Sequence, residues 1–565
     1  MTKLQELQLS GECPSWMEES GFKTLSSGYF LAGETPKGMW TRVSQASAKA
    51  LGKPDLADKF FDLFWKGWLC GASPVLSNMG TDRGLPISCF SLHPADSTDS
   101  ILNKAHELAM LSKHGGGVGI YAGDIRAAGS PISSGGTTEG VVPFLKIYDS
   151  VITGISQGNV RRGAAAIYLP VRHGDAEAFL RIRRPEGDPN RQCLNLHHGI
   201  SLTDEFIKSA LSGDPKDSHM LSEIYKARME TGEPYLFFHD NVQKNRPQWY
   251  KDLNLPVVTS NICTEIFLYT DSEHTFVCDL SSLNAAKWDE WKNTDAVYLT
   301  AWFLEGVMNE FISKAKCMKG FESAVRFAEK SRAIGIGILG FHTLLQSEMS
   351  SMDSFRAKIL NKAIFKHIKE NALRASQAMA KEYGEPEWCK GHGVRHSHLL
   401  AVAPTSSNST ISGNVSAGIE PLNANAYSKR SAKGIFLEYN PTLKILLQAK
   451  GRDSEEVWKS ITGNSGSVAH LDFLSKEEKD VFKTAFEIDQ RALIDLAADR
   501  QPFICQGQSL NLFFSADVDP QYFHEVHLQA WEKGLNSLYY VRSSSVLKAD
   551  LSSRGEAENC KACEG

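Results

Sequence analysis

Three side chains with useful chemistry lie close together in the segment Asn261-Ile262-Cys263-Thr264-Glu265. The segment precedes the strand-like run FLYT, so we expect it to form an extended loop. Alternate side chains of an extended chain point to one side, which would bring Asn261, Cys263 and Glu265 into one pocket. A carboxamide can hold hydroxyl groups, a thiol can change its redox state, and a carboxylate can accept a proton. Short polar triplets are common, so these residues alone leave a plain polar loop open as the alternative.

The remaining cysteines occur in two kinds of sequence setting. The chain holds 11 cysteines, and an odd number scattered along a chain does not indicate the disulfide framework of a secreted protein. Cys89 and Cys278 lie in apolar, strand-like runs, where a lone cysteine is usually a small core residue. Cys560 and Cys563 form a Cys-x-x-Cys pair within the polar stretch 548–565, which we interpret as a mobile tail.

The sequence predicts neither a metal site nor a dinucleotide site. A single Cys-x-x-Cys cannot complete a zinc tetrahedron, and the sequence lacks His-Glu-x-x-His. His197 and His198 are neighbours, and neighbours in a strand point to opposite faces. The run GIGILG at 335–340 has the G-x-G-x-x-G pattern, but the charged, helix-like FAEKSRAI precedes it where a dinucleotide site needs a strand. Close packing of the backbone is therefore the favoured interpretation of these glycines.

Two other groups allow either a functional or a structural interpretation. Residues 405–409, TSSNS, follow Ala403-Pro404 and carry hydroxyl and amide groups. Such groups at the N-terminus of a helix suit an anionic phosphate, although a simple capping cluster is the alternative. Tyr539 and Tyr540 are adjacent, and adjacent aromatic residues are core residues far more often than redox relays.

The elements that must position these residues follow a pattern typical of an α/β protein. Residues 15–80 are largely helical in pattern, as in ADKFFDLFWKGWL at 57–69. The stretches 128–141 and 155–163 are polar and contain glycine, which predicts loops. Between 164 and about 430, short apolar runs alternate with helical patterns, which indicates parallel strands joined by helices.

Composition excludes several classes of protein. The chain has 565 residues, of which 42% are hydrophobic and 22% charged, as in ordinary globular proteins of two to four domains. Its net charge of −5 gives no basic face for nucleic acid. No run approaches the 18 or so apolar residues that predict a membrane span, and the N-terminus lacks the apolar core of a signal peptide. We expect a cytoplasmic location.

The order of several long segments gives a more specific indication. Over nearly its whole length the chain resembles the large subunit of class I ribonucleotide reductases. The matching segments, in family order, are SCFSLHPADSTDS (88–100), GIYAGDIRAAGSPI (119–132), SQGNVRRGAAAIYLP (156–170), SNICTEI (260–266), VCDLSSLN (277–284), RAIGIGILGFH (332–342), APTSSNSTISGNVSAGIEP (403–421), QGQSLNLF (506–513) and WEKGLNSLYYVR (531–542).

The resemblance implies a fold and three regions. The fold is an α/β protein with a ten-stranded α/β barrel, built of two five-stranded parallel halves, with a helical N-terminal domain and a flexible C-terminal tail. Residues 1–80 would form the helical domain, 81–547 the catalytic barrel and 548–565 a redox tail. The radical cysteine would sit on a finger loop through the centre of the barrel.

The resemblance also implies a role for each member of the N-x-C-x-E motif. Cys263 would become a thiyl radical that removes the 3′ hydrogen of a ribonucleotide. Glu265 would take the 3′-hydroxyl proton, and Asn261 would hold the substrate hydroxyls. The 2′-hydroxyl would then leave as water, giving a 2′-deoxyribonucleotide.

Two cysteine pairs would supply the electrons. By resemblance, Cys89 and Cys278 deliver two electrons to the substrate and become a disulfide. Their Cα atoms must then come within about 7 Å of each other. Cys560 and Cys563 on the tail would reduce this disulfide by exchange, and thioredoxin or glutaredoxin would reduce the tail in turn.

Substrate binding and radical supply are implied at further positions. The segment 405–409 matches the family's substrate phosphate site; its residues are Thr405, Ser406, Ser407, Asn408 and Ser409. Ser73 and Ser88 are additional expected contacts of the substrate. No cofactor is expected in this chain. The radical would come from a metal-containing small subunit through Tyr540, the outer relay, and then Tyr539, the inner relay.

Regulation is implied at the positions of the family's specificity site. Asp96, Arg126 and Ile132 would bind a deoxynucleotide or ATP effector, with Asp96 on a ribose hydroxyl and Arg126 on phosphate. Gln157 and Arg161 would face the substrate base from the loop 155–163, which with the loop 127–141 would connect effector to substrate. A homodimer is expected.

The sequence departs from many large subunits at its start. The helical pattern begins at about residue 15, without the signature of an ATP-binding cone, so we expect no overall control by ATP and dATP. The chain resembles compact members found in some bacteria and phages; a phage enzyme would work in the host cytoplasm. Two rivals remain open, a cobalamin-dependent reductase and a non-catalytic nucleotide-binding relative. A glycyl-radical reductase would need a C-terminal glycine motif, which is missing.

Overall fold

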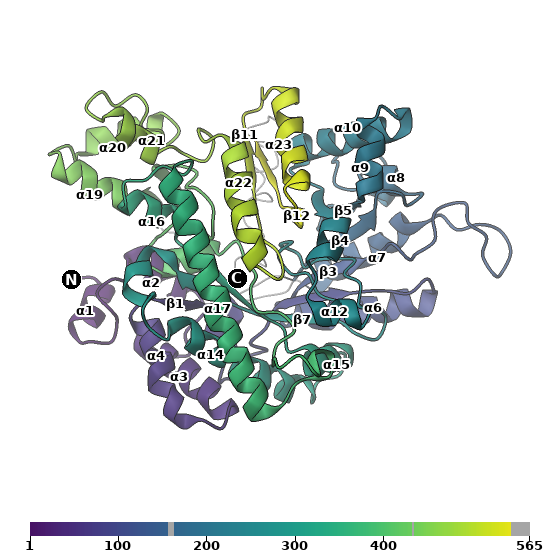
Figure 1. The fold of residues 1–565 in the computed structure, drawn as a ribbon, viewed down its shortest axis with the longest axis horizontal. Coiled ribbons are helices and arrows are strands. Elements are labelled where there is room, and N and C mark those ends of the chain that lie inside the picture. The colour runs from purple at the N-terminus through teal and green to yellow at the C-terminus, as the bar shows by residue number, and fades with distance from the viewer. Residues whose placement is uncertain (156–162, 432–433, 544–565) are drawn as a thin grey trace.

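A computed structural model describes residues 1–155, 163–431 and 434–543 (Figure 1). Four residues of the predicted sites, Gln157, Arg161, Cys560 and Cys563, lie outside the described residues. No helix in the described ranges is both long enough and apolar enough to cross a membrane.

The N-terminal region is helical, as its pattern predicts, and it packs on the barrel. Its elements are α1 Lys3–Leu9, α2 Glu19–Ser26, α3 Pro36–Ala50, α4 Ala57–Trp65, the short strand β1 Leu69–Gly71 and α5 Ser73–Asn78. The apolar face of α4 buries Phe60 and Phe64, whose rings meet the ring of Phe303 edge-on at 5.6 and 5.2 Å. Strand β1 pairs with a barrel strand, Leu69 opposite Leu283, so the helical region continues into the barrel sheet.

The first half of the barrel contains five parallel strands joined by helices. The strands are β2 Cys89–Leu92, β3 Gly117–Tyr121, β4 Ala164–Pro170, β5 Leu196–Leu202 and β6 Tyr235–Phe238. They are paired in this order and all in parallel. Their residues are almost continuously buried, because helices cover a parallel sheet on the outside and the barrel interior fills the inside.

Helices of the first half form its outer layer, on the side of Figure 1 away from the N-terminal helices. They are α6 Thr98–Lys113, α7 Val141–Ile155, α8 Ala176–Phe179, α9 Asp204–Leu211, α10 Pro215–Thr231, α11 His239–Asn245 and α12 Gln248–Asp252. Three of them begin at a capping side chain: Ser97 before α6, Thr203 before α9 and Asp214 before α10.

The second half of the barrel is less regular. Strands β7 Phe276–Asn284 and β8 Ile334–Leu339 are parallel. Single parallel bridges continue the sheet from Ile336 to Leu400 and from Val402 to Gln508, and β11 Leu512–Phe514 is parallel to β13 Val541–Ser543. The halves join through two antiparallel contacts, β2 with β7 and β6 with β12 Ser537–Leu538. The predicted barrel of two parallel halves is confirmed, with two of its strands reduced to short bridged segments.

Helices of the second half pack outside these strands, and the long α17 crosses the molecule in Figure 1. They are α13 Trp288–Trp291, α14 Ala296–Ala315, α15 Glu322–Ser331, α16 Phe341–Ser347, α17 Phe355–Tyr383, α18 Ser406–Ile411, α22 Gln490–Arg500 and α23 Pro520–Glu532. A smaller lobe has its own hydrophobic core; it comprises β9 Ala426–Ser431, β10 Gly434–Tyr439, α19 Pro441–Ala449, α20 Glu455–Gly463 and α21 Lys476–Val481.

The first two glycines of the G-x-G-x-x-G match belong to strand β8 and pack closely, as predicted, and the third, Gly340, precedes α16. A Cβ atom at Gly335 would lie 2.3 Å from Cδ2 of Leu280, and one at Gly337 would lie 2.7 Å from the carbonyl oxygen of Ala401. Contacts under 3 Å are excluded for real side chains, so glycine lets neighbouring strands approach here. The pattern thus reports packing inside the barrel.

Candidate active site

The segment 261–265 crosses the middle of the barrel and is contacted from both halves. Strand β3 lies so close that a Cβ at Gly119 would be 1.8 Å from the carbonyl oxygen of Ser260. From β4, the Tyr168 hydroxyl donates to the carbonyl of Asn261 at 2.7 Å. From the second half, the hydroxyl of Ser509 donates to the carbonyl of Cys263 at 2.6 Å, and that of Ser537 to the carbonyl of Thr264 at 3.0 Å. The segment is therefore held as a loop inside the barrel.

The loop is a tight turn, so the prediction of an extended segment was wrong. The backbone N–H of Thr264 donates to the carbonyl of Asn261 at 3.3 Å, and Thr264 has a left-handed φ of 56°. The Asn261 side chain closes the turn, because its Oδ1 accepts from the backbone N–H of Glu265 at 3.1 Å while its Nδ2 donates to Oε1 of Glu265 at 2.9 Å. Asn261 and Glu265 thus come together through side-chain hydrogen bonds, with Cys263 between them in the turn.

Glu265 is a buried carboxyl group whose pKa lies close to neutral pH. Burial raises its pKa to about 7, against the hydrogen bonds from Asn261 and Ser509, which favour the carboxylate. The Ser509 hydroxyl lies 3.1 Å from Oε2 of Glu265. A carboxyl group with this pKa can accept a proton at neutral pH and release it again.

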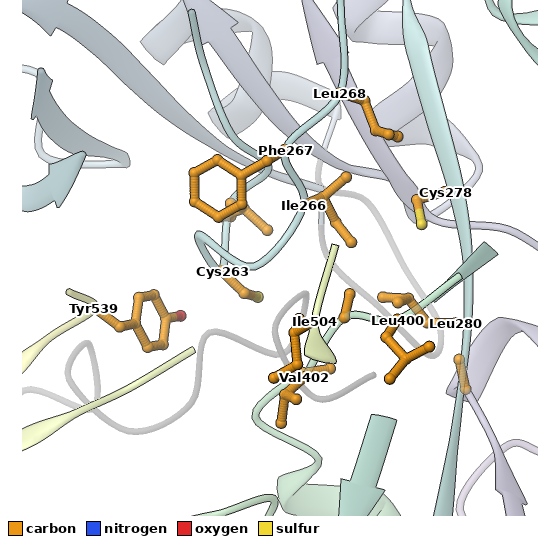
Figure 2. Close-up of a cluster of buried hydrophobic side chains, with 14 of the residues drawn as sticks. Cys263, Ile266, Phe267, Leu268, Cys278, Leu280, Leu400, Val402, Ile504 and Tyr539 are labelled. Atoms are coloured by element: carbon orange, nitrogen blue, oxygen red, sulfur yellow. The ribbon is translucent and has the colours of Figure 1, made fainter. Parts of the chain in front are cut away.

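Cys263 and Tyr539 face each other across the interior. Both side chains are buried, at 4% and 1% exposure. Figure 2 shows the Tyr539 ring directed with its hydroxyl toward Cys263. The backbone N–H of Tyr539 donates to the carbonyl of Leu510 at 2.9 Å, which fixes this strand beside the segment that carries Ser509.

Cys89 and Cys278 are direct cross-strand partners where the two halves of the barrel meet. They occupy opposite positions in the antiparallel pair of β2 and β7. Opposed residues in such a pair have Cα atoms about 4.5–5.5 Å apart, within the range that a disulfide spans. Neither forms a disulfide with another cysteine of the described residues. Burial raises the pKa of Cys278 well above the usual thiol range, although Nε2 of Gln506 donates to its Sγ at 3.6 Å.

Residues 405–409 begin the short helix α18, as predicted. Thr405 has a left-handed φ of 57°, and its hydroxyl oxygen accepts from the backbone N–H of Gly418 at 2.7 Å. Nδ2 of Asn408 donates to the carbonyl of Gly71, while its Oδ1 is buried without a hydrogen-bond partner among the described residues. Ser406 is exposed, Ser407 is partly buried, and Ser409 donates to the carbonyl of Ser406.

The two predicted additional contacts lie on neighbouring segments. Ser73 is the first residue of α5, which follows Gly71, the residue that Asn408 contacts. The Ser73 hydroxyl is 2.7 Å from that of Tyr29. Ser88 directly precedes Cys89, and its carbonyl accepts from the N–H of Gly117. Both serines are buried.

Tyr539 and Tyr540 are part of a cluster of three tyrosines. Their ring centroids are 4.3 Å apart, and the ring of Tyr235 from β6 lies 4.8 Å from that of Tyr539 and 5.0 Å from that of Tyr540. The Tyr540 hydroxyl is 3.1 Å from Nδ1 of His197 on β5. Adjacent tyrosines in contact with each other, one of them facing Cys263, suit stepwise radical transfer.

Asp96 and Arg126 of the predicted effector site bind each other. Nε of Arg126 donates to Oδ2 of Asp96 at 2.7 Å, and Nη1 donates to the carbonyl of Pro131 at 2.8 Å. Ile132 follows on the surface with 37% of its area exposed. The three predicted residues therefore lie together, with Asp96 and Arg126 forming an ion pair where separate contacts to ribose and phosphate were expected.

Several site residues were missed from the sequence. Tyr168 and Ser537 hold the central turn, and they lie within matching segments but carry no local signal. Ser509 and Gln506 belong to QGQSLNLF, a segment quoted for the resemblance without a role for either residue. Glu233 contacts both His197 and His198, at 2.6 and 2.9 Å, although neighbours in a strand were expected to face apart. The described residues contain no group of three or more His, Cys, Asp or Glu suited to a metal ion.

Comparisons with known proteins agree with this geometry. The family model described as "Ribonucleotide reductase, barrel domain" matches residues 87–217, 214–391 and 386–541, and "Ribonucleotide reductase, all-alpha domain" matches 17–84. The ribonucleoside-diphosphate reductase large subunit of Invertebrate iridescent virus 3 is 36% identical over 590 residues, covering 90% of this chain and 92% of that protein. A Frog virus 3 protein, provisionally given the same name, is 40% identical over 536 residues, covering 91% and 93%.

A solved structure extends the likeness to three dimensions. The structure titled "Actinobacillus ureae class Id ribonucleotide reductase alpha subunit" superposes with a TM-score of 0.88 at 41% identity, covering 94% of this chain and 98% of that one. Together with the family models, this similarity leaves one assignment: the chain belongs to the ribonucleotide reductase large-subunit family and is a catalytic subunit of that enzyme.

Proposed function

We propose that this chain reduces ribonucleoside diphosphates to 2′-deoxyribonucleoside diphosphates at the turn of Asn261, Cys263 and Glu265. The observation that carries this proposal is the placement of that turn in the barrel interior, together with Cys89 and Cys278 in the strands around it, a pair that can be oxidised to a disulfide. The diphosphate form of the substrate is taken from the names of the viral relatives.

Each group has a step in the proposed reaction. The Cys263 thiyl radical takes the 3′ hydrogen atom, and Glu265, with a pKa of about 7, takes the proton of the 3′-hydroxyl. The 2′-hydroxyl leaves as water. Cys89 and Cys278 give two electrons and two protons and become a disulfide, and the hydrogen atom returns from Cys263 to the 3′ carbon. We propose that Cys560 and Cys563 reduce this disulfide by exchange and are themselves reduced by thioredoxin or glutaredoxin.

We place the substrate phosphates at residues 405–409. Backbone N–H groups at the start of α18 and the hydroxyls of Ser406 and Ser407 can bind phosphate oxygens. Ser73 and Ser88 lie on neighbouring segments and extend the proposed site toward Cys89.

We propose a metal-containing small subunit as the source of the radical, which enters through Tyr540 and reaches Cys263 through Tyr539. The contact between the two tyrosine rings and the direction of the Tyr539 hydroxyl support this route (Figure 2).

A second copy of the chain and an effector belong to the same proposal. Helices α6 and α7 border a hollow of about 620 Å³, lined by Ala109, Pro143, Lys146, Ile147, Ser150, Val151, Gly154 and Ile155. Its mostly apolar lining supports a dimer contact there. Asp96 precedes α6, so a deoxynucleotide that separates Asp96 from Arg126 would bind beside this face. Gln157 and Arg161 complete the proposed connection to the substrate.

The experiment that tests the radical route is Tyr540→Phe, assayed with a metal-loaded small subunit and, separately, with adenosylcobalamin. The change removes one hydroxyl and little volume, and phenylalanine is too hard to oxidise to relay a radical. We expect activity with the small subunit to disappear while substrate binding and subunit binding persist. Full activity of the variant with adenosylcobalamin as the only additive would instead establish the cobalamin-dependent alternative.

A further inference from the structure

The outer tyrosine has a nitrogen base within hydrogen-bond distance. The Tyr540 hydroxyl is 3.1 Å from Nδ1 of His197, and the two rings meet at 81°. His197 lies on β5, in the first half of the barrel, whereas Tyr540 lies beside β13 in the second. The contact therefore joins the two halves at the point where the proposed radical route enters the chain.

Glu233 holds that histidine from the other side. Its Oε1 lies 2.6 Å from the same Nδ1. Its other oxygen, Oε2, accepts from the backbone N–H of His198 at 3.0 Å, lies 2.9 Å from Nδ1 of His198, and is 3.8 Å from Nε of Arg183. Burial alone would raise the pKa of Glu233, but Arg183 and the two histidines hold that pKa well below the usual range. Glu233 is thus a buried carboxyl group whose surroundings favour its charged form.

The position of Nδ1 between these two oxygens gives it two alternative states. Nδ1 has room for one proton, so it either accepts from the Tyr540 hydroxyl or donates to Glu233. When the phenolic proton moves to Nδ1, this nitrogen stops accepting from Tyr540 and begins to donate to Glu233. The imidazolium that results lies against a carboxylate, which stabilises its charge.

Tyr540 needs such an acceptor because of its surroundings. Its side chain is buried, and the guanidinium carbon of Arg542 lies 4.5 Å from its ring centroid. If the tyrosine lost an electron and kept its proton, the cationic radical would be buried beside the positive charge of Arg542, which is unfavourable. The titratable and charged groups found around the phenol are His197, Glu233, Arg542 and the neighbouring tyrosines.

We propose that His197 is the proton acceptor of Tyr540 during radical transfer and that Glu233 is the positioning residue that stabilises the protonated histidine. When the small subunit's oxidant takes one electron from Tyr540, the O–H bond breaks and the proton moves to Nδ1 of His197, leaving a neutral tyrosyl radical. The Tyr540 radical then takes a hydrogen atom from Tyr539. The proton returns from His197 to Tyr540 after turnover, when Tyr540 is again a radical and the small subunit gives the electron back. This inference rests on the proposed radical route.

The variant that tests it is His197→Asn in the full chain, assayed with the small subunit. The Asn Oδ1 can occupy the place of Nδ1 and accept the phenol hydrogen bond, but it cannot take the proton at neutral pH. We expect kcat to fall by about a hundred-fold, the scale of general base catalysis, with KM unchanged. The matched control is His198→Asn, which also removes a ring from Glu233 but does not contact Tyr540, and we expect it to keep most of kcat.

A second measurement separates proton transfer from positioning. A polyfluorinated tyrosine at position 540, ionised at the assay pH as judged by its absorbance, has no proton to lose. With it, the chain carrying His197 and the chain carrying Asn there should have the same kcat. A defect that persists would overturn the inference, as would full activity of His197→Asn with tyrosine at 540. Neither result would touch the radical route itself, which fails only if Tyr540→Phe is active with the small subunit.

Discussion

The hydroxyl of Ser509 offers a direct way to move the pKa of the proposed general base. It lies 3.1 Å from Oε2 of Glu265 and 2.6 Å from the carbonyl of Cys263. Burial already raises the pKa of Glu265 to about 7, and the Ser509 hydrogen bond lowers it. Ser509→Ala removes this hydrogen bond, so the carboxylate loses stabilisation and we expect the pKa to rise further.

The size of the expected rise in the pKa of Glu265 follows from the free energy that one hydrogen bond to a charged group contributes. Such a bond contributes about 1.5–3 kcal/mol, and 1.36 kcal/mol corresponds to one pKa unit. The hydroxyl has one hydrogen and lies closer to the Cys263 carbonyl, so we take the lower end and expect a pKa of roughly 8. At pH 7 the ionised fraction then falls from about one half to about one tenth.

The assay is the pH dependence of kcat/KM for substrate reduction. A general base must be ionised, so activity rises with pH through the pKa of Glu265. We expect Ser509→Ala to shift the acid limb up by about one unit, to cost about five-fold at pH 7, and to match the unmodified chain at pH 9 and above. The control is Ser537→Ala, because that hydroxyl donates to the carbonyl of Thr264 in the same turn and does not contact Glu265.

Three results would refute this reasoning. An acid limb that stays in place would mean that Ser509 does not stabilise the carboxylate. A shift to lower pH would mean that the hydrogen bond favours the protonated form. An equal shift in Ser537→Ala would show that any loss of a hydroxyl around the turn has the same effect.

Three further changes have expected outcomes. Cys263→Ser should abolish turnover while nucleotide binding, followed by calorimetry, persists, because a hydroxyl is far harder to oxidise than a thiol; substantial product would exclude the thiyl role. Cys560→Ser with Cys563→Ser should allow one round of reduction and block thioredoxin-driven turnover, and a small dithiol should partly restore it; unchanged turnover would make the tail pair incidental. Burial raises the pKa of Asp279 on strand β7 well above its usual range in the folded chain. As pH rises above the pKa of the unfolded chain, the unfolded state ionises Asp279 while the folded state does not, so the free energy of unfolding falls. The free energy of unfolding of Asp279→Asn, measured with denaturant, should therefore rise relative to that of the unmodified chain between pH 4 and 7, by up to about 1.4 kcal/mol per pH unit. A difference between the two chains that does not change with pH would contradict the pKa shift.

The sequence by itself determined the barrel and most of the proposed catalytic groups. Alternating apolar runs and helical patterns predicted parallel strands joined by helices, and the order of matching segments predicted the two halves. The first signal is local, since strand and helix periodicities can be recognised in consecutive residues, whereas the second rests on the family resemblance along the chain. The residue types of Asn261, Cys263 and Glu265 allowed this chemistry, and the family resemblance implied their roles before any contact was known.

Only the tertiary structure decided how those groups act. The shape of the turn depends on the Asn261 side chain and on hydroxyls from distant segments, so local alternation predicted it wrongly. The pKa of Glu265 depends on desolvation by the whole barrel, and the approach of His197 to Tyr540 depends on closure of the two halves. Electrostatic environment and through-space contact are set by residues far apart in the chain. Sequence therefore predicts which groups are present, whereas packing decides their protonation and their partners.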